Sequence, residues 1–294
     1  MPLLILRGVF YNYKFNNIKE VISMLEYDLR KLQITELGML KDIHKLCSEN
    51  GIKYFLFYGT LLGAVRHGGF IPWDDDIDII MMHEDYKKFT KVCLDKLPKK
   101  YFLQNCDTDK DFPRVWSKVR INDTCCMEKE FRHLNIHYGI DMDIFELIYI
   151  SENKYISKIQ KLAAYIYRLL KFEKAHLAID KELREKKHII IFNILPNFIK
   201  EWLGKITERI AYSTADKKSK YVLEISEMLV LDSSLFENKS EIIFEESNFY
   251  APVDHKKILE LLYGDYMKLP AQEDRYGHGE RIVDFEKSYE IYRL

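Results

Sequence analysis

A buried strand that leads through a turn into a cluster of acids constrains this 294-residue chain more than any other stretch. The apolar residues 54–58 predict a buried strand, and Gly59-Thr60 interrupts it and starts a short helix. Thr60 is a candidate cap of that helix, and Gly59 lets a ligand approach the backbone. Pro72 ends any helix before four aspartates occupy the five positions 74–78.

These acids repel one another unless solvent, protons or a cation compensate their charge. Two like charges 4 Å apart cost about 1 kcal/mol in bulk water and several times more at a partly buried site. On a strand, Asp76 and Asp78 would share one face, whereas Ile77 and Ile79 would point to the core. A divalent cation that prefers oxygen ligands, Mg²⁺ or Mn²⁺, would make this arrangement favourable. A solvated acidic turn is the alternative, and the strand–turn–strand order argues against it.

Two further stretches alternate with the period of a strand. In residues 137–145, Asp141 and Asp143 share one face, so a strand placed beside Asp76 and Asp78 would complete a metal cage. In residues 115–121, Lys118 and Arg120 share a face. That face either points to solvent, as is usual for charges on a half-buried strand, or opens on the site and holds phosphates. The pattern leaves both interpretations open.

The patterns in the rest of the sequence predict further helices and short strands. Residues 37–47 have helical spacing and are followed by an Asn-Gly stop, and residues 84–97 form a second amphipathic helix. Short strands are expected at 101–104, 228–231 and 242–244, and helices at 156–172, 188–199 (broken by Pro196) and 254–264.

The run from Gly59 to Asp78 resembles the hallmark of the LicD family, GTLLGAxRHxxFIPWDDDID, over a long and nearly gapless stretch. The resemblance implies an α+β, nucleotidyltransferase-like fold with a mixed sheet flanked by helices. It implies a phosphotransferase that acts on cell-surface glycans with Mg²⁺ or Mn²⁺. The donor would be CDP-linked, such as CDP-choline or a CDP-alditol, and the acceptor a glycan or lipid-linked glycan.

The resemblance also implies roles for single residues. Asp143 stands in the family's IDIF element, so Asp76, Asp78 and Asp143 are the expected catalytic and metal-binding acids. Asp141 is a further metal candidate, either as a ligand or as a group that orients one. The chain's YGDYM segment with a later arginine and histidine matches a C-terminal family signature. The expected donor-binding residues are Gly59, Thr60, Arg66, Lys118, Arg120, Arg275 and His278.

Composition narrows the class of protein. The apolar fraction is 47%, enough for a substantial core, and the net charge of −1 argues against nucleic-acid binding. Five cysteines without CxxC spacing fit reduced thiols in the cytoplasm rather than a zinc site. Residues 1–7 are too short for a signal peptide, and no run reaches the ~18 apolar residues of a membrane span. The expected location is cytoplasmic, with peripheral membrane attachment left open.

Three regions are expected. Residues 1–150 would form the catalytic core with its N-terminal helix, 151–225 a basic helical subdomain, and 226–294 a segment that completes the core. Residues 151–210 carry 13 Lys and Arg against 7 Asp and Glu, a charge of +6. Their helices would either pack on the sheet with a solvated basic face or lie on an anionic membrane surface.

Two other functions remain open at this stage. One is a nucleotidyltransferase that attacks the α-phosphorus of a nucleoside triphosphate and releases pyrophosphate. The other is a non-catalytic, cation-binding scaffold for glycan assembly. The presence of all the expected acids argues against the scaffold.

Overall fold

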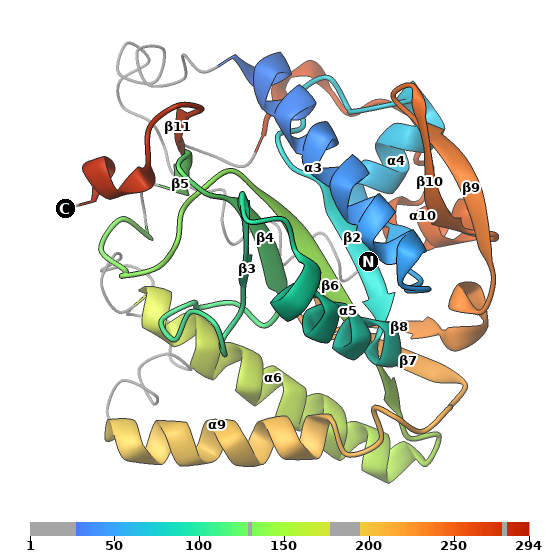
Figure 1. Cartoon of the computed structure of the whole chain (residues 1–294). Helices are drawn as coiled ribbons and strands as arrows, with labels where there is room; N and C mark the ends of the chain where they lie inside the picture. The colour runs from blue at the N-terminus through green and yellow to red at the C-terminus, as the bar shows by residue number, and fades with distance from the viewer. Residues whose placement is uncertain (1–27, 129–130, 177–194, 278–280, 294) are drawn as a thin grey trace.

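The computed structural model describes residues 28–128, 131–176, 195–277 and 281–293, and a mixed seven-stranded sheet runs through its middle (Figure 1). Five strands follow one another by hydrogen bonding, in the order β1 (Phe55–Leu56), β2 (Asp78–Met82), β6 (Asp141–Ile150), β4 (Ser117–Ile121) and β3 (Tyr101–Gln104). β7 (Tyr221–Glu224) extends the sheet from β6, and β8 (Leu229–Asp232) pairs with β7. The predicted α+β class is confirmed.

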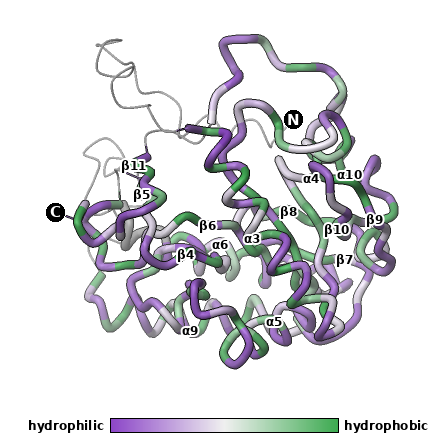
Figure 2. Tube along the Cα trace, turned by 45° about the horizontal axis from the view of Figure 1, so that its top comes forward, coloured by the Kyte–Doolittle hydropathy of each residue, from purple (hydrophilic) through white to green (hydrophobic). Residues whose placement is uncertain are grey.

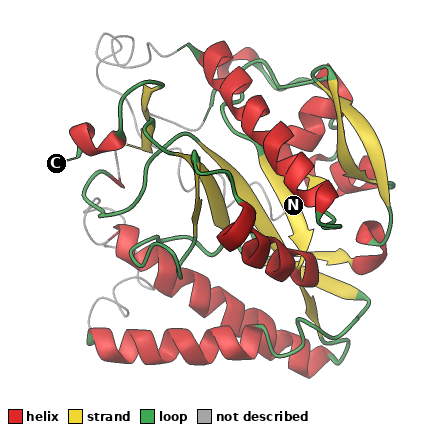
Figure 3. Cartoon of the chain, viewed as in Figure 1, coloured by secondary structure: helices red, strands yellow, loops and turns green. Residues whose placement is uncertain are grey.

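Helices surround this sheet (Figure 3). The helix expected at 37–47 is α3 (Leu29–Glu49), and its predicted apolar face is buried in the main core. Asn50 is its C-terminal cap, and Gly51 follows with a φ of 60°, a left-handed conformation that favours glycine. The other helices are α4 (Tyr58–His67), α5 (His83–Lys96), α6 (Lys154–His176), α9 (Asn197–Ala211) and α10 (His255–Tyr263).

The pairing of β2 with β6 determines which of their acidic residues lie opposite each other. The two strands are parallel, and Asp78 lies opposite Asp143 in the register. Neighbouring strands are about 4.8 Å apart, so the two carboxylates start from adjacent backbone positions. The residues that follow on β2, Ile79 and Ile80, are fully buried and fix this register in the core.

Two short hairpins complete the fold. β9 (Lys239–Phe244) pairs with β10 (Ser247–Pro252), and β11 (Arg281–Asp284) pairs with β5 (Cys125–Glu128). The second pairing carries the C-terminal part of the chain back to the middle of the sequence, beside the central sheet (Figure 1).

The start of α4 differs from the expectation. β1 has only two residues, and α4 already begins at Tyr58, whose φ is 39°. The prediction that Thr60 caps this helix was wrong: Phe57 occupies the cap position, without a side-chain hydrogen bond. The Thr60 hydroxyl instead accepts a hydrogen bond from the backbone N–H of Asp78, at 2.8 Å.

The basic helices pack together on one side of the molecule. α6 and α9 lie side by side below the sheet in Figure 1 and share a small core with residues of β6 and β7, among them Ile148 and Leu223. β7 lies inside the predicted subdomain 151–225 yet belongs to the main sheet. The division of the chain into the three regions 1–150, 151–225 and 226–294 stays a prediction.

No helix in the described part of the chain is long and apolar enough to cross a membrane.

Candidate metal centre

Three carboxylates converge at the start of the parallel strand pair. Asp76, Asp78 and Asp143 each offer an oxygen atom, and these atoms lie within 4.8 Å of one another. Asp78 and Asp143 are buried on β2 and β6, whereas Asp76 is half-buried and precedes β2. The prediction that Asp76 shares a strand face with Asp78 was thus wrong, because the strand starts only at Asp78. The loop nevertheless brings Asp76 to the same point.

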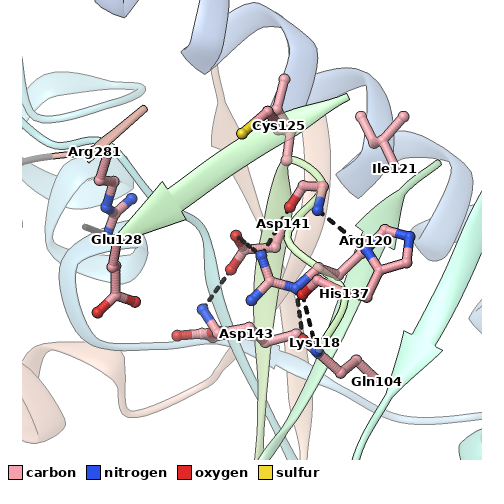
Figure 4. Close-up of polar contacts among 12 residues, drawn as sticks. Gln104, Lys118, Arg120, Ile121, Cys125, Glu128, His137, Asp141, Asp143 and Arg281 are labelled. Atoms are coloured by element: carbon pink, nitrogen blue, oxygen red, sulfur yellow. Dashed lines mark hydrogen bonds and ion pairs between the residues drawn. The ribbon is translucent and has the colours of Figure 1, made fainter. Parts of the chain in front are cut away.

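Two cations from β4 face the acids of β6 (Figure 4). In the register, Lys118 lies opposite Asp143 and Arg120 opposite Asp141. The Lys118 ammonium forms an ion pair with Asp141 and lies 2.7 Å from Oδ1 of Asp143. Nη1 of Arg120 lies 2.7 Å from Oδ1 of Asp141. Both cations are buried, so the interpretation of a solvated face was wrong.

This network shifts the pKa values of Asp141 and Lys118. Burial by itself raises the pKa of Asp141, but Arg120 and Lys118 outweigh it and hold that pKa below its usual value. Burial lowers the pKa of Lys118, but Asp141 and Asp143 raise it above the usual range. Asp141 is therefore a carboxylate committed to two cations, and it is not in the converging group. Its expected role as a metal ligand stays a prediction, and the geometry fits an orienting residue better.

Two hydrogen bonds outside the ion-pair network hold Arg120 in place. Its Nε donates to Oε1 of Gln104 at 2.6 Å, and its Nη1 donates to the carbonyl oxygen of Gly139 at 2.8 Å. A Cβ on Gly139 would lie 1.9 Å from the carbonyl oxygen of Ile121, so only glycine allows this close approach. His137 lies beside the network, where burial and the charge of Arg120 lower its pKa to about 3. It is therefore a neutral group at physiological pH.

Gly59 and Thr60, in the first turn of α4, both contact the acidic loop. A Cβ on Gly59 would lie 2.6 Å from Oδ2 of Asp74, so the absence of a side chain makes room for that carboxylate at the first turn of the helix. A negative charge is favoured there by the helix dipole. Thr60 holds the backbone of Asp78. Both residues thus adjoin the acidic loop, Gly59 at Asp74 and Thr60 at Asp78, and their expected contacts with a donor stay predictions.

The remaining expected donor-binding residues lie next to the same loop. Nη1 of Arg66 donates to the carbonyl oxygen of Tyr266 at 2.9 Å. The Arg275 guanidinium lies 5.3 Å from the centre of the Trp73 ring. Burial lowers the pKa of Arg66, and Asp74 and Arg275 act on it with opposite signs, so the two arginines are neighbours. His278 lies outside the described residues.

Two buried residues escaped the sequence interpretation. Arg281 of β11 donates from Nη1 to the carbonyl oxygen of Asp75 at 3.2 Å and lies 3.5 Å from its Oδ2. Burial lowers the pKa of Arg281, but Asp75 and other acidic groups raise it well above its usual value. No signal in the sequence marks Arg281, because its burial depends on the pairing of β11 with β5.

Glu36 of α3 is the second of these residues. It is 1% exposed, and burial together with Asp76, Asp141 and Asp75 raises its pKa well above the usual 4.5. Its Oε2 atom is buried without a hydrogen bond. A signal was available here, because Glu36 stands at a helical spacing of four from Leu32 and Leu40, on the apolar face of α3.

The residues present fit a divalent cation. The three converging groups provide oxygen ligands alone, the set that Mg²⁺ and Mn²⁺ prefer. Oδ1 of Asp143 is buried and makes no hydrogen bond, although it lies in the ion pair with Lys118. A buried carboxylate oxygen of this kind retains a lone pair for a cation.

The part of the chain that contains these acids is similar to known proteins. Residues 51–178, which include all three acids, match the family model described as LicD/FKTN/FKRP, nucleotidyltransferase domain. The chain is 29% identical over 265 residues to the lipopolysaccharide cholinephosphotransferase LicD of Haemophilus influenzae, a match that covers 87% of this chain and 97% of that protein. It is 54% identical over 35 residues to the human ribitol 5-phosphate transferase FKRP, which are 12% of this chain and 7% of that protein. An uncharacterized protein of Rickettsia typhi is 40% identical over 97 residues, 31% of each chain.

Proposed function

The chain belongs to the LicD family, and from that premise we propose that it is a phosphotransferase that moves a phosphorylated small group to a cell-surface glycan. The group is phosphocholine or a phosphoalditol, the donor is its CDP-linked form, and CMP is released. The acceptor is a hydroxyl of a glycan or lipid-linked glycan precursor. A cytidine nucleotide donor would place the reaction in the cytoplasm, at the inner face of the membrane when the acceptor is lipid-linked.

The observation that carries this proposal is the convergence of Asp76, Asp78 and Asp143 within 4.8 Å. Phosphoryl transfer depends mainly on positioning and on neutralising the charge of the phosphoryl oxygens. A site with three acids and no cysteine or histidine among them suits this chemistry through Mg²⁺ or Mn²⁺. The relationship to a cholinephosphotransferase over nearly its whole length supports phosphocholine as the transferred group.

The chain's own residues have distinct tasks in this reaction. Asp78 and Asp143 would hold a divalent cation from neighbouring strands, and Asp76 would complete the site from the loop. Lys118 and Arg120 balance the charge of the β6 acids, so that the site does not collect excess negative charge. When bound there, such a cation would supply positive charge that offsets the charge of the phosphoryl oxygens.

The transfer exchanges one oxygen–phosphorus bond for another. The acceptor oxygen forms a bond to the phosphorus that carries the choline or alditol, and the bond from that phosphorus to the bridging oxygen of CMP breaks. The bridging oxygen takes the electron pair, and one of the site aspartates accepts the hydroxyl proton. Arg66 and Arg275, which lie beside the acidic loop, are the proposed contacts of the diphosphate.

The test combines donor binding with product analysis. Purified full-length chain with Mg²⁺ is heated with CDP-choline, CDP-ribitol, CDP-glycerol or CTP, and the matching donor should raise the melting temperature. A ligand at 100 times its Kd stabilises the native state by about 2.7 kcal/mol. The same donor is then incubated with deacylated lipopolysaccharide, and the products are separated by anion exchange.

The outcomes discriminate between the three functions. Release of CMP with labelled glycan supports the proposal, and Asp143→Asn should lower the rate by a factor of 100 or more while the protein stays folded. Pyrophosphate release from CTP would replace the proposal with a nucleotidyltransferase. Cation binding without binding or turnover of any of these nucleotides would favour the scaffold.

A further inference from the structure

The outward face of α6 is apolar, which is unusual for a helix at the surface of a protein. Its buried side contains Gln160, Ala163 and Ala164, which face the sheet and the end of α9. On the opposite side, Tyr155, Ile159 and Leu162 are 77%, 58% and 60% exposed. They are separated by four and three residues, so they form one stripe along the helix. A soluble protein rarely exposes such a continuous stripe without a use for it.

A row of lysines follows one edge of this stripe. Lys154, Lys158 and Lys161 have the same spacing of four and three residues as the apolar side chains. No ion pair to any of the three lysines occurs among the residues that the structure describes. The apolar stripe and the lysine row together give α6 the two faces of a helix that lies in a membrane interface.

The neighbouring helix has the same character. On α9, Phe198 and Trp202 are 72% and 62% exposed and lie one turn apart. α6 and α9 together contain 9 Lys and Arg residues against 3 Asp and Glu residues, a net charge of +6, although the whole chain has a net charge of −1. Hydrophobic and hydrophilic residues alternate along both helices (Figure 2). α6 and α9 thus combine an excess of positive charge with exposed aromatic and aliphatic side chains.

We propose that the outward face of α6, with the exposed aromatic residues of α9, docks on the surface of an anionic lipid bilayer. The apolar stripe would enter the boundary between headgroups and acyl chains, and the lysine row would lie at the level of the anionic headgroups. The stripe runs from Tyr155 to Leu162, so about 10 Å of helix would lie along the membrane. This docking does not depend on which group the enzyme transfers.

Vesicle sedimentation tests the proposal with the full-length protein. The probes are vesicles of phosphatidylcholine alone and of phosphatidylcholine with about one third phosphatidylglycerol, at low and high salt. We expect binding to the anionic vesicles, weak binding to the neutral ones, and loss of binding as salt rises. Each lysine near an anionic surface contributes about a fivefold gain in affinity.

Two variants separate the contributions of charge and apolar area. Reversal of Lys154, Lys158 and Lys161 to Glu should weaken binding about 100-fold or more, because three favourable contacts become repulsive. Ile159→Ser with Leu162→Ser should weaken it without changing its dependence on salt. The matched control reverses the exposed lysines of another surface, Lys256, Lys257 and Lys268. Circular dichroism checks that each variant is folded.

Three results would overturn the proposal: failure of the unmodified protein to bind anionic vesicles, equal loss of binding in the control, and unchanged binding in the Lys-to-Glu variant. A fourth such result could come from light scattering, which measures the oligomeric state of the free protein. If the chain is a dimer that the Ile159→Ser, Leu162→Ser variant dissociates, and vesicles are not bound, this face is an interface between two copies.

Discussion

The hydrogen bond from the Asp78 N–H to the Thr60 hydroxyl offers a direct test of how the site is held. The two atoms are 2.8 Å apart, and Thr60 is 3% exposed, so water cannot replace the hydroxyl. Thr60→Val keeps the shape of the side chain and removes the acceptor. A buried N–H left without a partner costs about 1–3 kcal/mol. The folded-to-unfolded ratio should fall about 5- to 150-fold, since 1.4 kcal/mol is tenfold.

Thr60→Ser is the matched control. It keeps the acceptor and loses one methyl group, which costs about 0.8 kcal/mol of burial. Urea unfolding followed by circular dichroism measures both variants, and the slope of the free energy against urea should not change. In thermal unfolding, each kcal/mol corresponds to about 2–4 °C for a chain of this size.

A second measurement connects this bond to the carboxylates. Thr60 holds the backbone of Asp78, so its loss should loosen one of the three converging acids. Titration with Mn²⁺, followed by electron paramagnetic resonance, should show weaker binding for Thr60→Val than for Thr60→Ser. If the valine variant were as stable as the serine variant and bound Mn²⁺ equally well, the assignment of Thr60 as the support of Asp78 would be refuted.

Three further predictions concern buried charges. A group whose pKa is raised in the folded state, such as Glu36, favours folding below its unfolded pKa and loses that contribution as pH rises. In urea titrations, Glu36→Gln should therefore be more stable than the parent near pH 8 and equally stable near pH 4. The exposed control Glu49→Gln should match the parent at both pH values. Lys118→Met breaks a buried ion pair and should cost about 3–5 kcal/mol without metal; scanning fluorimetry should show that Mn²⁺ restores more stability in this variant than in the parent. Arg281→Met removes the contact with the Asp75 backbone and should weaken Mn²⁺ binding several-fold, with Arg281→Lys intermediate; equal affinities in all three proteins would contradict a positioning role.

Local patterns in the sequence predicted much of the framework. The amphipathic spacing of residues 37–47 and 84–97 corresponds to α3 and α5, and the strand expected at 101–104 is β3. Alternation correctly placed Lys118 and Arg120 on one face of β4. These features depend on neighbours within one element, where side-chain periodicity and backbone geometry leave few choices.

The alternation of side chains along β4 did not predict that Lys118 and Arg120 are buried. A charged face on a strand is normally solvated, and only the pairing of β4 with β6 sets Lys118 against Asp143 and Arg120 against Asp141. Once these groups are buried together, leaving any one of them without its partner would be strongly destabilising.

The sequence by itself determined that crowded acids follow a glycine–threonine turn, and carboxylates at that density require compensation of their charge. The tertiary structure decided which of them converge. Parallel pairing places Asp143 opposite Asp78, an irregular loop brings Asp76 to them, and two cations take Asp141 out of the group. Arg281 and Glu36 come to the same place from distant elements. Such long-range placements follow from strand register and core packing, which a local pattern does not encode.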